Sequence, residues 1–328
     1  MELTFPRVSL AHLPTPLEAM PASTRALAGP QLFVKRDDCT GLALGGNKTR
    51  KLEFALGDAL AKGADTILTS GGLQSNHVRQ TAAACARLGL GCHAVVANPL
   101  ARAPAAYRES GNQLLDRLLG AVVHEVPDGA GATEARLAEL ARALSERGAR
   151  PYVVPLGASD GIGALGYVEC ARELVEQCRA ADVHPTHVFL ATGSCGTHAG
   201  LLAGLRLHGS GMQVIGVAVS ETASAKRAKV LDVVRQVGDV LGRAAMPVDE
   251  GDVVVFGGYV GAGYGLPTEA GAAALERVAR AEGLLLDPVY TAKAMAGMLD
   301  LLAGGRLRGV RDPVFLHTGG TPALFAYA

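Results

Sequence analysis

Two lysines, Lys48 and Lys51, stand three residues apart directly after the glycine pair Gly45-Gly46. Arginine supplies most of the other basic side chains in this chain. A lysine amine can lose its proton in an apolar setting and form a Schiff base with a carbonyl compound, whereas an arginine guanidinium keeps its charge. Lys48 and Lys51 are therefore candidate nucleophiles, although a glycine turn followed by a helix with two solvated lysines has the same pattern.

A first junction suited to anion binding is Gly71-Gly72-Leu73-Gln74-Ser75-Asn76-His77. It stands between a predicted strand at 66–69 and a predicted helix at 76–88. The glycines allow a tight turn, the helix start offers unpaired amides, and Ser75 and Asn76 add hydrogen-bonding groups of short reach. This pattern fits a carboxylate site, with simple capping of the helix by Ser75 or Asn76 as the alternative.

A second junction is Thr192-Gly193-Ser194-Cys195-Gly196-Thr197, between a predicted strand at 187–191 and a predicted helix at 198–207. Small residues allow a ligand to approach closely, backbone amides converge at the helix start, and Ser194 and Thr197 offer hydroxyls. These features indicate a phosphate site. The lysine of a nucleoside-triphosphate loop is missing, which argues against a triphosphate site. A plain glycine turn is the alternative.

Two tyrosines in the second half of the chain stand in unusual settings. Tyr264 lies between Gly263 and Gly265, and Tyr290 follows a proline turn at the start of a predicted helix. A tyrosine flanked by glycines has no adjacent side chain to pack against, which favours a ring that faces a cleft, and a hydroxyl there can act as an acid or a donor. Tyrosines that only pack, with satisfied hydroxyls, are the alternative. The match to GxGxxG at 161–166 follows its strand too distantly for a dinucleotide site.

Composition narrows the class of protein. The chain has 328 residues, of which 49% are hydrophobic and 19% are charged, and its 31 basic residues balance its 31 acidic residues. This balance gives no electrostatic argument for nucleic acid or for an anionic membrane, so a small neutral or zwitterionic partner is expected. The first residues have no signal-peptide pattern, which predicts a cytoplasmic protein. The six scattered cysteines predict buried free thiols, with neither disulfides nor a metal site.

Short apolar runs alternate with alanine- and leucine-rich segments, which predicts an α/β protein with largely parallel strands. Its length favours two domains. Strands are expected at 31–35, 66–69, 92–97, 121–126, 152–155, 187–191, 214–219 and 314–317. Helices are expected at 48–61, 76–88, 112–119, 132–146, 163–179, 198–207, 268–282 and 290–303.

Four separated motifs, at 45–53, 74–80, 193–200 and 286–291, stand in an order that resembles the pyridoxal-phosphate enzymes of the D-cysteine desulfhydrase and 1-aminocyclopropane-1-carboxylate deaminase family. The likeness runs nearly end to end and includes 34–38 and 317–320. It implies the tryptophan synthase β-like fold (fold type II), with two open twisted α/β domains and pyridoxal 5'-phosphate between them. It also implies a homodimer, a large cofactor-binding domain at 1–53 and 162–328, and a smaller inserted domain at 54–161.

Carried onto this sequence, the resemblance implies a role for each motif. Lys48 forms the Schiff base, Lys51 helps to neutralise the phosphate, and the cofactor-binding loop comprises Thr192, Gly193, Ser194, Cys195, Gly196 and Thr197. Asn76 lies against the cofactor ring or its phenolic oxygen, while the substrate carboxylate is held by Ser75, Asn76 and His77. Tyr264 and Tyr290 flank the substrate, so Lys48, Ser75, Tyr264 and Tyr290 are the expected catalytic residues. Cys195 departs from the family pattern, in which a glycine is usual.

Thr291 decides between the branches of the family. The deaminases have a glutamate after the matching tyrosine, which pairs with a protonated pyridine nitrogen, whereas Thr291 offers only a neutral hydrogen bond. The Tyr290-Thr291 pair matches the D-cysteine desulfhydrase pattern and predicts α,β-elimination from D-cysteine, giving pyruvate, ammonia and hydrogen sulfide. The alternatives are an L-cysteate sulfo-lyase, then a 1-aminocyclopropane-1-carboxylate deaminase, and, from another class, a non-catalytic binder of a phosphorylated ligand.

Overall fold

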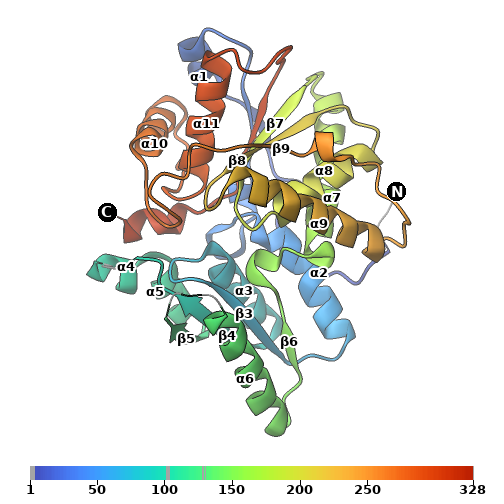
Figure 1. Ribbon diagram of the computed structural model, residues 1–328, viewed down its shortest axis with the longest axis vertical. Helices are drawn as coiled ribbons and strands as arrows, with labels where there is room; N and C mark the ends of the chain where they lie inside the picture. Colours follow the sequence, from blue (N-terminus) through green and yellow to red (C-terminus); the bar gives the residue numbers. More distant parts are fainter. Residues whose placement is uncertain (1–3, 101–103, 128, 130, 328) are drawn as a thin grey trace.

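The computed structural model describes residues 4–100, 104–127, 129 and 131–327, and its strands form two sheets in two lobes (Figure 1). The large lobe holds a six-stranded sheet in the order β1-β2-β10-β7-β8-β9, and the small lobe holds a four-stranded sheet in the order β5-β4-β3-β6. All neighbouring strands run parallel except β1 and β2. This arrangement confirms the predicted α/β class with mostly parallel strands.

The strands of the large sheet are β1 (Leu17–Ala19), β2 (Phe33–Lys35), β7 (His187–Thr192), β8 (Gln213–Ala218), β9 (Val254–Phe256) and β10 (Val314–Leu316). The strands of the small sheet are β3 (Thr66–Gly72), β4 (Gly91–Ala97), β5 (Val122–Val126) and β6 (Pro151–Val153). Every strand of the small sheet falls inside the predicted insert at 54–161. The predicted domain boundaries themselves stay predictions, and residues 1–3 and 328 lie outside the described residues.

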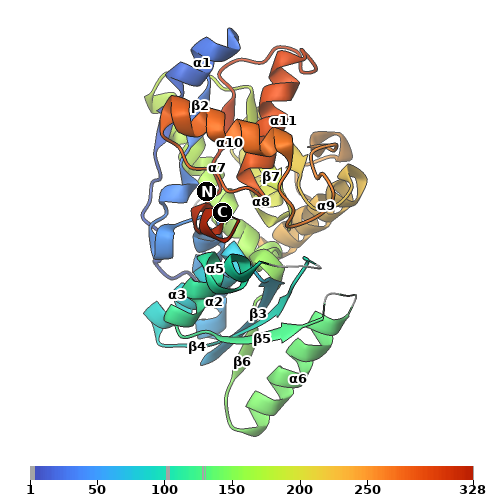
Figure 2. The same cartoon turned by 90° about the vertical axis from the view of Figure 1, so that its left-hand side faces the viewer.

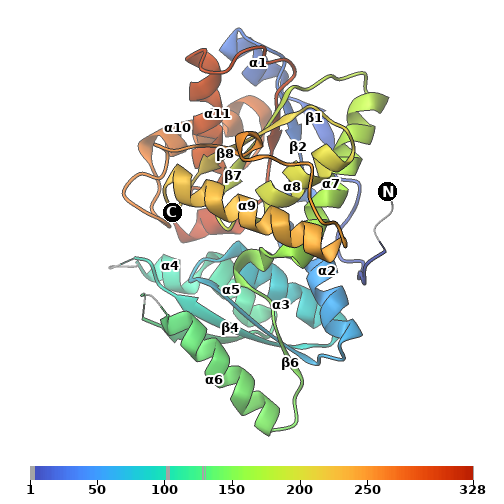
Figure 3. The ribbon, with the colours of Figure 1, turned by 45° about the vertical axis from the view of Figure 1, so that its right-hand side comes forward.

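Helices cover both faces of the large sheet, which explains why its strands are apolar on both sides (Figures 1 and 3). One face packs against α7 (Gly161–Ala180), α8 (Gly196–Leu207) and α9 (Ala223–Val240). The other face packs against α1 (Pro21–Leu27), α10 (Glu269–Glu282) and α11 (Thr291–Ala303). The large lobe is thus a three-layered α/β unit.

The small lobe is also layered (Figure 2). One face of its sheet packs against α2 (Lys48–Ala61), α3 (Asn76–Leu88), α4 (Ala105–Glu109) and α5 (Gly111–Leu118), and the other face packs against α6 (Ala132–Glu146). Helix α2 also contacts α7 of the large lobe. Because α2 begins at Lys48 and contacts both lobes, it places that lysine at their junction.

Five 3-10 helices complete the described chain: η1 (Asp37–Cys39), η2 (Leu42–Leu44), η3 (Leu156–Ala158), η4 (Glu250–Asp252) and η5 (Thr321–Ala326). The last of these, η5, packs against α4 and α5 of the small lobe although it follows β10 of the large sheet. Figures 1 and 2 both show this dark red segment directly above α5.

Most predicted helices agree closely with the structure, and those at 48–61, 76–88 and 132–146 have the expected bounds. Helix α9 was not predicted, although its four buried valines follow helical spacing at 230, 233, 234 and 237. Valine is β-branched and a poor helix former, so packing on the sheet, rather than local propensity, explains this helix. The strands β1 and β9 are three residues long and gave no clear alternation.

All six cysteines are free thiols, and five of them are buried. The prediction of buried thiols is wrong for Cys39, which is exposed at the end of η1. Among the described residues, no group of three or more metal-ligating side chains comes together. None of the described helices has the length and apolarity that crossing a membrane requires.

A buried charged cluster lies behind the start of α2. Arg50 donates through Nε to Asp37 Oδ2 at 2.9 Å and through Nη2 to Glu173 Oε1 at 2.8 Å. Lys35 of β2 donates to the same Glu173, which stands on α7, and Tyr167 donates to Asp37. Since buried charges require partners, this cluster links η1, β2, α2 and α7 in one specific arrangement.

Candidate active site

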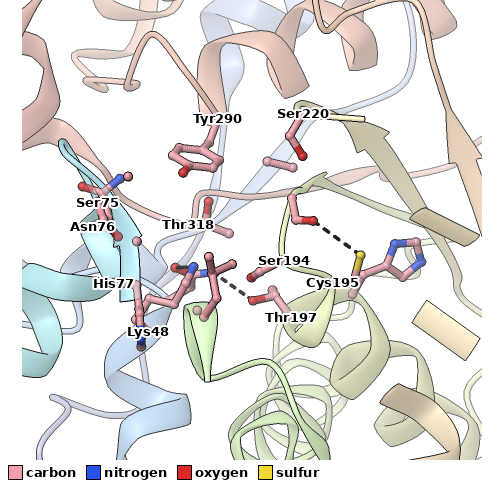
Figure 4. A pocket seen from close by; sticks show the side chains of 18 of the residues that line it. Lys48, Ser75, Asn76, His77, Ser194, Cys195, Thr197, Ser220, Tyr290 and Thr318 are labelled. Atoms are coloured by element: carbon pink, nitrogen blue, oxygen red, sulfur yellow. Dashed lines mark hydrogen bonds between the residues drawn. The ribbon is translucent and has the colours of Figure 1, made fainter. Parts of the chain in front are cut away.

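A cavity of about 310 Å³ lies between the lobes, next to the carboxyl ends of β3, β7, β8 and β10. Ligands bind at this edge of parallel sheets in α/β proteins. Ten of the residues expected in the site line the cavity, namely Lys48, Ser75, Asn76, His77, Gly193, Ser194, Cys195, Thr197, Tyr264 and Tyr290. In Figure 4, Ser75 and Asn76 stand on one side, Ser194, Cys195 and Thr197 on the other, and Tyr290 lies above.

Lys48 is the first residue of α2 and its amine donates from Nζ to Asn47 Oδ1 at 2.9 Å. The pKa of Lys48 is lowered to about 8, mainly by burial and in part by the positive charge of Arg79, while the charge of Asp287 acts in the opposite direction. Below pH 8 the amine is mostly charged and above pH 8 it is mostly neutral. This pKa lies close to physiological pH, so part of the Lys48 amine is in the neutral form that a nucleophile or a base requires.

The phosphate-type loop leads from β7 into α8. Cys195 has φ of 76°, in the left-handed region that favours glycine, which is the physical reason why a cysteine is unusual here. The oxygen of Thr197 accepts from Asn47 Nδ2 at 2.9 Å, and the oxygen of Ser194 accepts from Ser159 Oγ at 2.7 Å. In these bonds both hydroxyls act as acceptors. Their protons are therefore available to donate to an anion in the cavity.

Lys51 lies behind this loop rather than in the cavity. It is completely buried, and its Nζ donates to Ser159 Oγ at 2.8 Å. Ser159 Oγ also accepts from the backbone amide of Gly196 at 3.3 Å. Burial and the nearby charge of Lys48 lower the pKa of Lys51 well below its usual value. The amine of Lys51 thus reaches the phosphate-type loop through Ser159, a residue that the sequence analysis did not single out.

The opposite end of the cavity is the start of α3. Ser75 is the N-cap, because its Oγ accepts from the Val78 amide at 3.3 Å, which confirms the capping alternative for this side chain. The Asn76 side chain does not cap the helix. Instead, its Oδ1 accepts from Asn112 Nδ2 of α5 at 2.9 Å. Asn76 therefore has a fixed orientation at the cavity wall.

The ring of His77 has a defined tautomer. Thr69 donates its hydroxyl proton to Val154 O at 2.8 Å, so the Thr69 oxygen accepts from His77 Nε2, which lies 2.7 Å away. Burial and the charge of Lys48 lower the pKa of His77 well below its usual value, so the ring is neutral. Its Nδ1 is then an unprotonated acceptor, and it has no partner among the described residues. A carboxylate cannot pair with this atom, so the predicted carboxylate contact of His77 is left to its backbone amide and stays a prediction.

Tyr264 and Tyr290 form a pair across the cavity roof. Their hydroxyl oxygens lie 2.5 Å apart, and their rings meet edge to face with centroids 6.0 Å apart. Burial raises the pKa of both hydroxyls. A methyl-sized group added at Gly72 would lie 3.3 Å from the Tyr264 ring, so the loop before Ser75 also touches this tyrosine. The pair keeps its protons and can donate one of them to a ligand.

Four expected site residues do not line the cavity: Lys51, Thr192, Gly196 and Thr291. Thr192 is buried with its Oγ1 3.0 Å from His198 Nδ1. Thr291 is completely buried, and its Oγ1 donates to Asp287 Oδ1 at 2.7 Å. Their roles as cofactor ligands stay predictions. The hydroxyl proton of Thr291 is already donated to the carboxylate of Asp287.

Several lining residues were not predicted. Ser220 and Glu221 follow β8, Thr318 and Gly319 follow β10, and Lys226 and Lys229 stand on α9. The buried amine of Lys226 donates to Glu221 Oε1 at 2.8 Å. The residues after β8 and β10 could have been found, because polar groups at the carboxyl ends of parallel strands share one edge. The two lysines could not, because the helix that bears them was not predicted.

A scan against protein families matches residues 8–319 to the model described as "Pyridoxal-phosphate dependent enzyme". The chain belongs to this family. This membership confirms the predicted pyridoxal 5'-phosphate cofactor and an enzyme in place of a non-catalytic binder.

Curated relatives of this family member match over nearly the whole chain. It is 47% identical to a D-cysteine desulfhydrase of Yersinia enterocolitica over 98% of this chain and 96% of the relative. It is 46% identical to a D-cysteine desulfhydrase of Klebsiella pneumoniae with the same coverage. These matches confirm the expected relationship to the D-cysteine desulfhydrase branch.

Solved structures confirm the fold type. An ACC deaminase homologue superposes with a TM-score of 0.89 at 35% identity, covering 99% of this chain and 94% of that one. An L-serine ammonia-lyase from Rhizomucor miehei superposes with a TM-score of 0.67 at 19% identity, covering 96% of both chains. The second likeness concerns the fold alone. Together with the two sheets described above, these structures support the predicted fold type II.

The cavity fits pyridoxal phosphate on the chemistry of its donors. The Lys48 amine suits the aldehyde, and the Ser194 and Thr197 protons and the α8 amides suit the phosphate. The start of α3 remains available for the carboxylate of an amino acid. The cavity therefore has separate groups for the cofactor and for the substrate.

Proposed function

We propose that this protein is a pyridoxal-phosphate-dependent carbon–sulfur lyase that converts D-cysteine to pyruvate, ammonia and hydrogen sulfide. The observation that carries the proposal is the place of Lys48, whose pKa of about 8 and position between an anion loop and a carboxylate site suit elimination chemistry. The choice of D-cysteine rests on relatives that are 46% and 47% identical over nearly the full chain.

In this proposal, Lys48 would hold the cofactor covalently, and the start of α8 would bind its phosphate. Ser194 and Thr197 donate their hydroxyl protons to it, and Lys51 increases the acidity of Ser194 through Ser159. When bound, the cofactor stabilises the electron pair that proton removal leaves on the α-carbon of the substrate. A hydroxyl suits its ring nitrogen. Thr291 is the predicted residue, but its proton is donated to Asp287, whereas Thr318 lines the cavity.

The start of α3 binds the substrate carboxylate. The backbone amides there lack helical partners, and Asn76 is held in place by Asn112. His77, also predicted to hold the carboxylate, offers its backbone amide for this role, because its ring Nδ1 is buried and unprotonated. These contacts orient the bond between the α-carbon and its hydrogen, which is how a protein directs this chemistry toward elimination.

The amine of Lys48, where it is free, would accept the α-proton of the substrate. The carbon–sulfur bond breaks, and sulfur leaves with its electron pair. The Tyr264–Tyr290 pair has a proton to donate to the departing thiolate. The three-carbon product is hydrolysed to pyruvate and ammonia, so atoms and protons balance with one water consumed.

The test is to incubate purified holoenzyme with D-cysteine, L-cysteine, L-cysteate and 1-aminocyclopropane-1-carboxylate, and to measure pyruvate, 2-oxobutanoate, sulfide and sulfite. We expect equal amounts of pyruvate and sulfide from D-cysteine. A Lys48→Ala variant serves as the control for chemistry catalysed by free cofactor. Sulfite from L-cysteate as the main product would replace the proposal with the sulfo-lyase.

The deaminase is the second candidate, because the structure that superposes with a TM-score of 0.89 is an ACC deaminase homologue. Thr291 argues against it, since a threonine cannot supply the negative charge that favours a protonated pyridine ring. We therefore expect little 2-oxobutanoate. Efficient formation of 2-oxobutanoate would reverse the assignment of the branch.

The homodimer and the cytoplasmic location also remain proposals that rest on the family resemblance. A small amino acid as the partner agrees with the family. Size-exclusion chromatography with light scattering tests the dimer: a mass of twice the 33.6 kDa chain is expected.

A further inference from the structure

The loop that presents Tyr264 to the cavity has no regular secondary structure. Residues 257–267 lie between β9 and α10 without a helix or a strand. Tyr264 nevertheless has a specific position, because its hydroxyl lies 2.5 Å from that of Tyr290. Its loop therefore requires anchors from elsewhere in the molecule.

One such anchor is Tyr327, which directly follows η5. Its hydroxyl donates to the carbonyl oxygen of Gly265 at 2.6 Å, and Gly265 is adjacent to Tyr264. Its ring meets the ring of Tyr107 edge to face, at 83° and with centroids 5.3 Å apart. Tyr107 is buried in the core of the small lobe. Tyr327 thus joins the loop of the large lobe to the small lobe.

The η5 segment that carries Tyr327 is held by both lobes. Toward the large lobe, Thr321 Oγ1 donates to Leu285 O at 3.3 Å, and Gly320 packs so closely on Asp287 that an added Cβ would lie 2.8 Å from that side chain. Toward the small lobe, Ser110 Oγ donates to Phe325 O at 2.8 Å. Because η5 is attached to both lobes, its position depends on both of them.

The same segment borders the carboxylate site. Gln74, one residue before Ser75, donates to Tyr107 O at 2.6 Å. A small second cavity behind the tyrosine pair is lined by Gln74, Tyr107, Tyr264 and Tyr327 together. The residues that contact Tyr327 are therefore adjacent to Tyr264 at one side of the substrate site and to Ser75 at the other.

We propose that Tyr327 is a positioning residue for Tyr264, which holds the loop at 257–267 against the small lobe so that the Tyr264 hydroxyl faces the substrate. Its place in the reaction rests on the proposed function, whereas its hold on the loop does not. Tyr327 does not line the main cavity, and its hydroxyl bonds to Gly265, next to Tyr264, so its effect on the reaction is indirect and passes through the Tyr264 loop.

The test compares Tyr327→Phe with wild type. The phenylalanine keeps the ring contact with Tyr107 and loses the hydrogen bonds of the hydroxyl, to Gly265 O and to the Tyr107 side chain. We expect kcat for D-cysteine to fall about fivefold to tenfold, the size of one hydrogen bond. The KM and the affinity for pyridoxal phosphate stay unchanged, because the carboxylate and phosphate sites are intact. The matched control is Phe325→Ala, since this neighbouring side chain is 66% exposed and should change neither quantity.

A double variant shows whether Tyr327 acts through Tyr264. In Tyr264→Phe/Tyr327→Phe the loss in kcat should equal that of Tyr264→Phe alone, because the second change then has nothing left to misplace. Additive losses, or an unchanged kcat in Tyr327→Phe, would overturn the positioning role.

Hydrogen exchange followed by mass spectrometry separates this inference from the proposed function, because it needs no substrate. Peptides covering residues 257–267 should exchange about fivefold to tenfold faster in Tyr327→Phe holoenzyme and at the wild-type rate in Phe325→Ala. Unchanged exchange contradicts the anchor, even if D-cysteine is turned over. Faster exchange in a protein that releases no sulfide from D-cysteine retains the anchor and rejects the substrate.

Discussion

Lys48 and Lys51 share a helix, yet their amines face different surroundings. The Lys48 amine reaches the main cavity, whereas the Lys51 amine is buried behind the phosphate-type loop and donates to Ser159. Burial lowers the pKa of both amines, to about 8 for Lys48 and well below the usual value for Lys51. Position relative to the cavity, more than basicity, therefore distinguishes the lysine proposed to bind the cofactor covalently from the one proposed to support it.

Replacing Lys48 with alanine should abolish the covalent bond to the cofactor. We expect the absorbance of bound pyridoxal phosphate to disappear and turnover of D-cysteine to fall at least about a thousandfold, because both the nucleophile and the base are lost. Borohydride reduction followed by peptide mapping of the wild type should place the cofactor on Lys48. Cofactor found on Lys51 would reverse the assignment.

The pKa of Lys48 also predicts a pH dependence for cofactor binding. The free amine is the reactive form, so apoenzyme should bind pyridoxal phosphate at a rate that rises with pH and levels off above about pH 8. Stopped-flow absorbance measures this rate. A rate that keeps rising to pH 10 would mean that burial does not lower this pKa.

Ser159 should matter for cofactor retention although it lies outside the motifs of the sequence. Ser159→Ala removes the donor to Ser194 and leaves the Lys51 amine without its acceptor. We expect the dissociation constant of pyridoxal phosphate to rise about tenfold, which corresponds to about 1.4 kcal/mol. Ser145→Ala on the exposed side of α6 is the control. Equal affinities in both variants would contradict the role of Ser159.

At the scale of the element, two neighbouring residues at the start of α3 have different roles. Ser75 caps the helix through the Val78 amide, while Asn76 is held by Asn112 and faces the cavity. Capping and ligand binding were alternatives for the pair, and the structure assigns capping to Ser75 alone.

Asn76→Ala should therefore raise KM and lower kcat together, with a loss in kcat/KM of about tenfold or more, because substrate orientation is lost along with binding. Its thermal stability should stay close to wild type. Ser75→Ala should instead lose about 1 kcal/mol of stability as a missing cap. Steady-state kinetics and urea unfolding of both variants check this contrast, and a destabilised Asn76→Ala with normal kinetics would contradict it.

The start of α11 has a different organisation. Asp287 accepts from the amides of Tyr290 at 2.8 Å and Thr291 at 2.8 Å, and also from the Thr291 hydroxyl. Both side chains are completely buried. A glutamate at position 291 would place a second carboxylate against Asp287, with no basic partner in these contacts.

Thr291→Glu should consequently destabilise the protein by about 3 kcal/mol or more, whereas Thr291→Ser keeps the hydroxyl and should cost less than about 1 kcal/mol. Urea unfolding of the two apoproteins measures the difference. If Thr291→Glu is as stable as wild type, its carboxylate has found another partner, and its effect on the cofactor can then be read directly.

At the scale of the whole molecule, the charged cluster around Arg50 fixes the helix that begins with Lys48. Burial alone would raise the pKa of Asp37 and of Glu173, but Arg50 and Lys35 hold both values below the usual range. The cluster thus stabilises the folded state only while both carboxyls are ionised.

The sign of the pH effect follows from these lowered values. Unfolded carboxyls titrate near pH 4, so the stabilisation is complete above about pH 4 and is lost as the pH falls through the lower pKa values of the folded state. Arg50→Met should lose about 3 to 5 kcal/mol at pH 7, since it leaves buried carboxylates with fewer partners. Urea unfolding between pH 3 and pH 7 checks both statements, and an Arg50→Met variant of wild-type stability would contradict them.

The sequence by itself determined the features that depend on neighbouring residues. Glycines and short polar side chains at the ends of apolar runs marked the two junctions, and helical spacing gave α2 and α3 their bounds. Lys48 could be singled out because a lysine after a glycine turn at a helix start is a local pattern. The family resemblance rested on motifs of this same local kind, which is why it agreed with the fold and the relatives.

Only the tertiary structure decided which groups meet across the chain. The bond between Lys51 and Ser159 joins residues 108 positions apart, and that between Tyr327 and Gly265 joins residues 62 positions apart. The hydrogen bond from Thr291 to Asp287 also depends on the tertiary structure, because a buried hydroxyl requires a partner and the fold determines which one is near. Periodicity and composition describe which face of an element is buried. They do not describe which distant element packs against it, and that packing fixes the geometry of this site.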